Sequence, residues 1–267
     1  MNDAWLQGLR ERLDAPPRRP RAPLCLANAD RAGAVVVGSI ESALARRLAD
    51  AGLAMRRAGD VWQIEVPATA AVDPALAALA RWLHSNGQAA AWRGELLPVV
   101  DAAGDTVGAI ERAAVRPLGI ATHAVHLVVH DPRGHVWVQQ RAFDKATDPG
   151  LWDTTVGGLM AVGESVVQTL ERESWEEAGL RIVELTSVTA PGRITVRRPL
   201  DKGYMVEHIE MFDAMLAAHC VPVNQDGEVE RFECLDRAAL VERLHADAFT
   251  LEAALILALW LLRRVRR

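Results

Sequence analysis

The distribution of hydrophobic and polar residues predicts alternating strands and helices in the first 118 residues. Apolar or alternating runs predict strands, and stretches of helix formers that end at glycine or asparagine predict helices. The proline- and arginine-rich stretch 16–23 precedes them and is predicted to be a loop. The predicted elements are a strand at 34–40, a helix at 41–51, a strand at 61–66, a helix at 73–85, and strands at 95–100 and 106–110. We therefore predict a small α+β domain over residues 1–118.

The remaining residues, 119–267, are predicted to form a second domain. Its first two strands are joined by the turn 131–134 and form a hairpin, and a later helix ends at Gly179. The predicted elements are strands at 123–130 and 136–140, a helix at 165–178, strands near 181–189, 205–215 and 229–234, and helices at 237–245 and 251–263. The last helix is apolar enough to be buried.

The composition is that of a folded globular protein. Of its 267 residues, 50% are hydrophobic and 24% are charged, so long disordered stretches are not expected. The formal net charge of -5 argues against the broad basic surface that non-specific binding of nucleic acid requires. We expect no nucleic-acid partner, and an anionic substrate must be met by local cations or by a metal.

The cysteines and the apolar segments indicate where the protein works. Cys25, Cys220 and Cys234 lack CxxC spacing, so neither a disulfide framework nor a zinc site is predicted. The N-terminus is charged and amphipathic and lacks the apolar core of a secretory signal. The apolar run 251–262 contains Glu252 and is too short to span a bilayer. We expect a cytoplasmic monomer or homodimer without a membrane partner.

An acidic helix preceded by a glycine-rich loop is the feature most specific for chemistry. Glu173 and Glu177 are four residues apart on the predicted helix and Glu176 is three from Glu173, so three carboxylates share one region and repel one another. A hard divalent cation relieves this repulsion, and Mg²⁺ typically binds a few carboxylates, waters and substrate phosphates. A solvated acidic face without a ligand is the alternative, and the preceding Gly157-Gly158 loop favours the metal site.

The spacing of these residues resembles the Nudix box, a glycine–glutamate loop followed by an arginine–glutamate helix. The seven matching residues are Gly158, Glu164, Arg172, Glu173, Glu176, Glu177 and Gly179. Ser174 departs from the pattern, which usually has a bulky aliphatic residue there, and its hydroxyl can bond back along the helix. The resemblance implies an α/β Nudix fold, a mixed sheet between helices, preceded here by the small α+β domain.

The resemblance also implies a role for each matching residue. Glu173 and Glu177 are expected to bind the metal directly, and Glu176 to hold the metal or its water. Arg172 is expected to orient these carboxylates. Glu164 would hold the loop or a water, and the Gly158 carbonyl would add one more ligand. The implied cofactor is Mg²⁺, with Mn²⁺ as an alternative, and the implied partner is a small-molecule diphosphate.

Outside the box the candidates are less specific. Glu228 follows the Asp226-Gly227 turn and is predicted to supply the additional metal-binding glutamate that Nudix enzymes often bring from a later loop, with an exposed turn residue as the alternative. Arg141 and Lys145 are predicted to bind phosphate, with solvated loop charges as the alternative. The three histidines of the strand 123–130 are given no role.

The chain also resembles, from about Val35 to Arg263, a Nudix subfamily with an N-terminal DUF4743 domain. The matching segments are 92–95, 110–114, 123–129, 141 with 145, 153–158 and 226–230. Relatives of this group are linked to thiamine diphosphate, so thiamine diphosphate or an oxidised form of it is the expected substrate. Because ligand sites often lie between domains, we expect the N-terminal domain to close over the site or to supply substrate contacts. Trp92, Arg93 and Glu95 are the candidate contacts, with structural packing as the alternative.

Two other functions fit parts of the sequence. An isomerase of isopentenyl diphosphate shares the Nudix fold, but it needs a catalytic cysteine near the box, and no cysteine lies between His123 and Gly192. A non-catalytic sensor that binds a nucleotide or vitamin diphosphate would typically have lost glutamates of the box, and here all are present.

Overall fold

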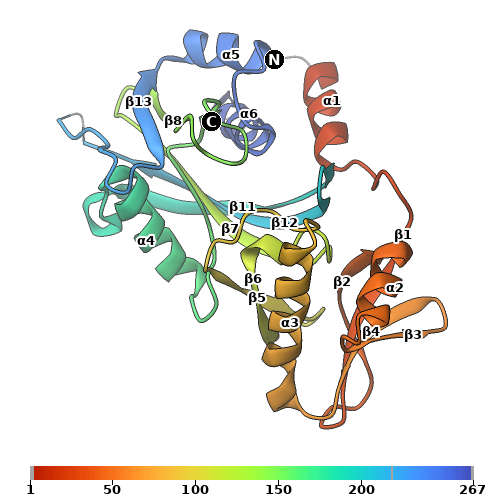
Figure 1. Ribbon diagram of the computed structural model, residues 1–267. Coiled ribbons are helices and arrows are strands. Elements are labelled where there is room, and N and C mark those ends of the chain that lie inside the picture. The colour runs from red at the N-terminus through yellow and green to blue at the C-terminus, as the bar shows by residue number, and fades with distance from the viewer. Residues whose placement is uncertain (1–2, 218, 266–267) are drawn as a thin grey trace.

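A mixed sheet forms the centre of the C-terminal half of the molecule. In the computed structural model, which describes residues 3–217 and 219–265, this sheet has seven strands. Its main order is β11-β12-β7-β8-β13, with β10 beside β7 and β9 beside β8; β12 runs parallel to β7, and the other pairs are antiparallel (Figure 1). The strands are β7 (Thr122–His130), β8 (Val136–Arg141), β9 (Trp152–Asp153), β10 (Val156–Leu159), β11 (Thr186–Leu200), β12 (Gly203–Met215) and β13 (Val229–Leu235).

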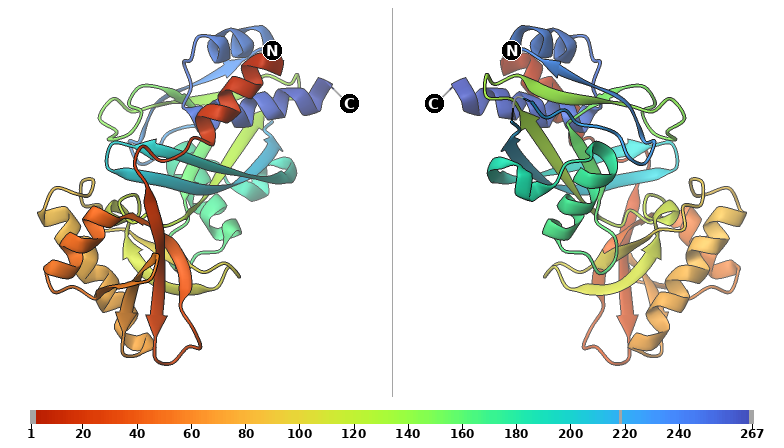
Figure 2. Two further views of the ribbon diagram at one scale, coloured as in Figure 1. Left: turned by 90° about the vertical axis from the view of Figure 1, so that its right-hand side faces the viewer. Right: turned by 90° about the vertical axis from the view of Figure 1, so that its left-hand side faces the viewer.

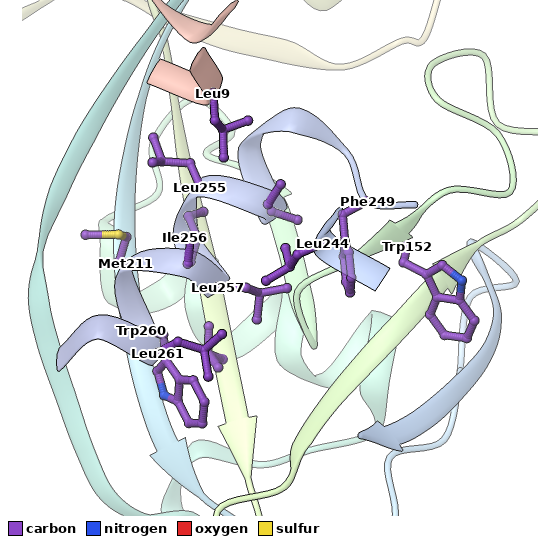
Figure 3. Packing of buried hydrophobic residues seen from close by; sticks show 14 of the residues in the cluster. Leu9, Trp152, Met211, Leu244, Phe249, Leu255, Ile256, Leu257, Trp260 and Leu261 are labelled. Carbon is purple, nitrogen blue, oxygen red and sulfur yellow. The ribbon is translucent and has the colours of Figure 1, made fainter. Parts of the chain in front are cut away.

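Helices cover both faces of this sheet, because its central strand is apolar on both sides. Val125 and Leu127 of β7 pack with α4 (Val166–Ala178) and the short η3 (Ile182–Glu184), whereas Ala124 and Val128 face the opposite core. That second core contains α1 (Asp3–Leu13), α5 (Arg237–His245) and the buried α6 (Leu251–Val265), as Figure 3 shows. A mixed sheet between helices, the predicted fold class, is thus confirmed. None of the helices among the described residues is long and apolar enough to cross a membrane.

The N-terminal half has a separate core and a sheet in the order β2-β1-β4-β3. A two-stranded hairpin, β5 with β6, lies between this half and the large sheet (Figure 1). The elements are β1 (Arg21–Asn28), β2 (Val35–Glu41), α2 (Ser42–Asp50), β3 (Met55–Ala58), β4 (Val61–Val66), η1 (Thr69–Ala71), α3 (Val72–Ser85), β5 (Leu96–Val100), β6 (Thr106–Glu111) and η2 (Arg112–Ala114).

Two local predictions are wrong. The loop predicted over 16–23 ends early, because β1 begins at Arg21 and pairs with β2 on one side and β4 on the other. The strand expected near 181–189 begins only at Thr186 and continues to Leu200, because it pairs along almost the whole length of β12. The short β3 was not predicted. The division into domains 1–118 and 119–267 stays a prediction, and α1 packs across it against α6.

Candidate active site

Helix α4 begins and ends at residues whose side chains or backbone conformation favour a helix end. The Ser165 hydroxyl accepts a hydrogen bond from the Gln168 amide (3.3 Å), and the Gln168 side chain accepts one from the Ser165 amide (2.9 Å). This reciprocal arrangement satisfies amides that the first helical turn leaves free. Gly179 ends the helix in the left-handed conformation, φ +63°, that favours glycine. The acidic residues of the helix are therefore held in fixed register.

Arg172 connects the acidic residues on the accessible side of the helix. Its Nη1 donates to Glu173 Oε1 (2.8 Å) and to Glu176 Oε2 (3.0 Å), and its Nε donates to Glu164 Oε1 (2.6 Å). Its Nη2 donates to the Leu159 carbonyl (3.1 Å), which fixes the guanidinium to β10. The hydrogen bond from Arg172 is the main reason why the pKa of Glu164 falls to about 2. One arginine thus holds Glu164, Glu173 and Glu176 together, whereas Glu177, which it was also expected to orient, bonds Gln139 and Gly157 instead.

Glu177 lies in the interior between α4 and the sheet. Its side chain is 2% exposed, and its Oε2 accepts hydrogen bonds from Gln139 Nε2 and from the Gly157 amide, both at 2.9 Å. Burial, and secondly the charge of Glu173, raises its pKa to about 8. Burial likewise raises the pKa of Glu173 to about 7, although Arg172 opposes this change. The negative charges of Glu173 and Glu177 are therefore only partly compensated by the surrounding protein groups.

Strand β10 approaches α4 so closely that a side chain at position 158 would have to displace the carboxyl group of Glu173. A Cβ atom at position 158 would coincide with the carboxyl group of Glu173, and one at position 157 would come within 2.8 Å of the His126 ring. The strand backbone and the Glu173 carboxyl group therefore lie directly against each other. A set of oxygen donors whose negative charge is only partly compensated fits a hard divalent cation.

The remaining predicted residues lie at the edge of this cluster. Lys145 forms an ion pair with Glu228, whose side chain is 56% exposed, and the Glu228 charge contributes to the raised pKa of Glu173. Arg141 is partly buried, and its Nη1 donates to Asp153 Oδ2 (3.2 Å). Glu228 thus pairs with Lys145 and acts on Glu173 through its charge, and Arg141 pairs with Asp153.

Comparison with known proteins agrees with this geometry. The model of the NUDIX domain matches residues 121–255, about half of the chain. The chain belongs to the Nudix family. Among similar proteins, chloroplastic Nudix hydrolase 24 of Arabidopsis thaliana is 30% identical over 66% of this chain and 49% of its own length. Isopentenyl-diphosphate Delta-isomerase of Streptomyces coelicolor is 31% identical over 62% of this chain and 82% of its own.

A similar solved structure is that of a protein from Deinococcus radiodurans. It has a TM-score of 0.48 and 21% sequence identity, and the match covers 58% of this chain and 92% of that chain. This Nudix chain spans about half the length of the Arabidopsis hydrolases that it matches. Nudix enzymes in general use divalent metal ions.

Several polar residues of this Nudix site were not predicted. Gln139 positions Glu177, and His126 lies against Gly157, where its Nδ1 is 2.8 Å from Thr154 Oγ1. The sequence signal for both is a polar residue in an otherwise apolar strand, which predicts a buried partner but not its identity. The proposed hydrogen bond of Ser174 back along the helix is wrong, because its buried hydroxyl has no hydrogen-bond partner among the described residues.

A second group of possible metal ligands lies away from the Nudix carboxylates. Ligand atoms of Asp131, His135 and Cys234 lie within 4.8 Å of one another near the turn from β7 to β8. Asp131 already accepts hydrogen bonds from the backbone amides of Arg133 (2.8 Å) and His135 (2.9 Å) and pairs with the Arg133 guanidinium. This carboxylate is therefore largely satisfied by the turn itself.

Proposed function

We propose that this chain is a metal-dependent Nudix hydrolase that splits the diphosphate of a small organic diphosphate into two phosphate-containing products. The observation that carries the proposal is the pair Glu173 and Glu177, one helical turn apart, both partly or wholly buried and both with raised pKa values. Buried carboxylates without a full set of cationic partners are costly unless a cation or a proton neutralises them. A bound divalent cation supplies that charge.

The residues proposed to hold the cation are the carboxylates of the cluster and one carbonyl. They are Glu173, Glu176, Glu177, Glu228 and the carbonyl of Gly158. We propose Mg²⁺ as the physiological ion, with Mn²⁺ as an alternative, because each of these ligands is an oxygen. When bound, the cation neutralises the diphosphate, polarises the phosphorus and lowers the pKa of water.

The residues of the chain itself organise the reaction. Arg172 holds Glu164, Glu173 and Glu176 in one orientation, so the cluster is formed before the substrate arrives. Water attacks one phosphorus, the bridging P–O bond breaks, and the bridging oxygen leaves with the other phosphate. Lys145 supplies a positive charge beside Glu228 where the phosphates are proposed to lie.

We propose thiamine diphosphate, or an oxidised analogue of it, as the substrate, with the monophosphate and phosphate as products. The support is the resemblance to the DUF4743 subfamily, which includes segment 92–95 of the N-terminal half.

An isomerase of isopentenyl diphosphate is the second candidate, because an enzyme of that name is 31% identical to part of this chain. That reaction requires a cysteine at the site. Cys25 lies on β1 in the N-terminal half, and Cys220 packs against the core that contains Leu170 of α4. Cys234 lies near the C-terminal end of β13, whereas Glu228 directly precedes the N-terminal end of that strand. The positions of the cysteines therefore favour hydrolysis.

The proposal is tested by measuring product release from a panel of diphosphates. Purified protein is incubated with thiamine diphosphate, oxidised thiamine diphosphate, a nucleoside diphosphate sugar and isopentenyl diphosphate, each with Mg²⁺ and with a chelator. Release that requires Mg²⁺ and favours a thiamine form supports both reaction and substrate. Release from a different diphosphate overturns the proposed substrate but not the proposed reaction. Binding without any release overturns the proposal that the protein is a hydrolase.

A further inference from the structure

The loop between β8 and β9 carries Lys145, the cation that is proposed to meet the phosphates. This loop starts close to the buried carboxylate of α4, because Gln139 of β8 donates to Glu177 Oε2 (2.9 Å) and Arg141 ends the same strand. A strand advances about 3.3 Å per residue, so the Cα atoms of Gln139 and Arg141 are about 7 Å apart. Lys145 forms an ion pair with Glu228. The conformation of the loop therefore decides where its ammonium group lies.

Backbone hydrogen bonds fix the base of this loop. The Arg141 amide donates to the Leu151 carbonyl (2.9 Å), and the Gly150 amide donates to the Arg141 carbonyl (3.2 Å). The Ala142 amide donates to the Glu228 carbonyl (3.0 Å), which attaches the loop to the segment that precedes β13. Figure 2 shows these two segments side by side, the loop in green and the segment before β13 in blue. The base of the loop is thus held from two directions.

The side chain of Arg141 holds the interior of the loop. Its Nε and Nη2 both donate to the Thr147 carbonyl (3.3 and 3.0 Å), and its Nη1 donates to Asp153 Oδ2 (3.2 Å). Asp153 pairs with Gln139 in the register of β8 and β9, so it is a fixed anchor. Each of the three guanidinium nitrogen atoms is therefore engaged within the protein, and the side chain is only 17% exposed.

The far side of the loop is held in the same way. Asp148 directly follows Thr147 and pairs with Arg198 of β11 (3.8 Å). The φ angle of Asp148 is +48°, in the left-handed region that residues with a side chain adopt less readily than glycine. Such a conformation persists where the surrounding contacts hold it. The contacts made by Arg141 and Arg198 on either side supply this restraint.

We propose that Arg141 is a positioning residue, which holds the loop so that Lys145 meets the diphosphate, and that it does not itself bind the phosphates. The proposal rests on the proposed function, which assigns Lys145 to the phosphates. To bind a phosphate directly, Arg141 would have to leave Asp153, whose side chain is 6% exposed. A buried carboxylate that loses its cationic partner is costly. The planar guanidinium fork suits the positioning role, because it donates to two acceptors in fixed directions.

The test is a double-mutant cycle on the binding of methylenediphosphonate, a diphosphate analogue in which carbon replaces the bridging oxygen. The Kd is measured by calorimetric titration of the full chain with Mg²⁺. Since a charge-assisted hydrogen bond contributes strongly, Lys145→Ala and Arg141→Ala should each raise the Kd about tenfold. The double variant should bind as weakly as Lys145→Ala alone, because residues that act through one contact are not additive. A double variant about 100-fold weaker than the wild type would overturn the proposal, as would unchanged affinity in either single variant.

A second variant separates the position of Arg141 from its charge. Arg141→Lys keeps the charge but lacks the fork that spans the Thr147 carbonyl and Asp153, so it should bind the analogue as weakly as Arg141→Ala. Affinity close to that of the wild type in Arg141→Lys would contradict the positioning role. Arg31→Ala is the control and should leave the Kd unchanged, because it breaks a partly buried ion pair with Asp101 in the N-terminal half. Binding of the analogue needs no turnover, so this result is distinguishable from a failure of the hydrolase proposal, which product release measures.

Discussion

The carboxyl group of Glu173 fills the space that a side chain at Gly158 would need. A methyl group at position 158 must therefore displace this carboxylate, since the strand backbone is fixed by its pairing with β7. We predict that Gly158→Ala loses activity while the domain still folds. Steady-state hydrolysis and a thermal unfolding curve measure both. Gly8→Ala on α1, where a Cβ meets open space, is the control that should retain full activity.

The raised pKa of Glu177 predicts how the stability of the metal-free protein depends on pH. Between the ordinary pKa of 4.5 and the folded value of about 8, the folded state binds more protons than the unfolded state. This contribution to the free energy of unfolding is complete below the ordinary pKa and is lost as the pH rises through the folded pKa. The Glu177→Gln variant should therefore lose less stability than the wild type as the pH rises.

Urea unfolding in the presence of a chelator, compared between about pH 5 and about pH 9, measures this contribution. The wild type should lose more stability over this range than Glu177→Gln. Equal losses in the two proteins would show that Glu177 is ionised in the folded state throughout, contrary to the effect of its burial.

The exposed Glu228 is predicted to have a smaller effect on the metal than the buried glutamates. Because its side chain is 56% exposed and pairs with Lys145, we expect Glu228→Gln to retain activity. The Mg²⁺ concentration for half-maximal rate should rise by about tenfold, the lower end of the 10–100-fold range found for residues that support a metal site. A Mg²⁺ titration of the initial rate measures this, and an unchanged midpoint would remove Glu228 from the ligand set.

The packing of α1 on α6 predicts that the N-terminal helix stabilises the Nudix half. Leu9 is 4% exposed and lies in the same core as Leu255 and Ile256 (Figure 3). Leu9→Ala should lower the free energy of unfolding by about 2–4 kcal/mol, as buried leucines do when truncated. Urea unfolding of Leu9→Ala and of the exposed control Arg10→Ala tests this; equal stability of the two would show that α1 contributes little.

The helix and strand elements that the sequence predicts best are those with strong local signals. The hairpin of β7 and β8 and the helix α4 have alternating or capped patterns, and their predicted bounds differ from the observed ones by at most one residue. β1 was missed because prolines and arginines precede it, and its stability comes from pairing with two neighbouring strands. Such pairing is a tertiary effect that no local pattern contains.

The candidate site could be predicted as far as its local spacing extends. The box residues of α4 were found because they lie at fixed helical intervals. Gln139 was not found, because its hydrogen bond with Glu177 joins segments 38 residues apart. The packing of α1 across the proposed domain boundary was missed for the same reason.

The measurement that tests the central claim most directly is the rate of diphosphate hydrolysis by two variants of one helix. Glu177→Gln removes a proposed metal ligand, whereas Glu171→Gln changes an exposed residue of α4 that is not part of the cluster. With saturating Mg²⁺ we predict a loss of more than about 100-fold for Glu177→Gln, because even supporting residues of a metal site contribute 10–100-fold. Glu171→Gln should match the wild type. Full activity of a folded Glu177→Gln protein would contradict the account.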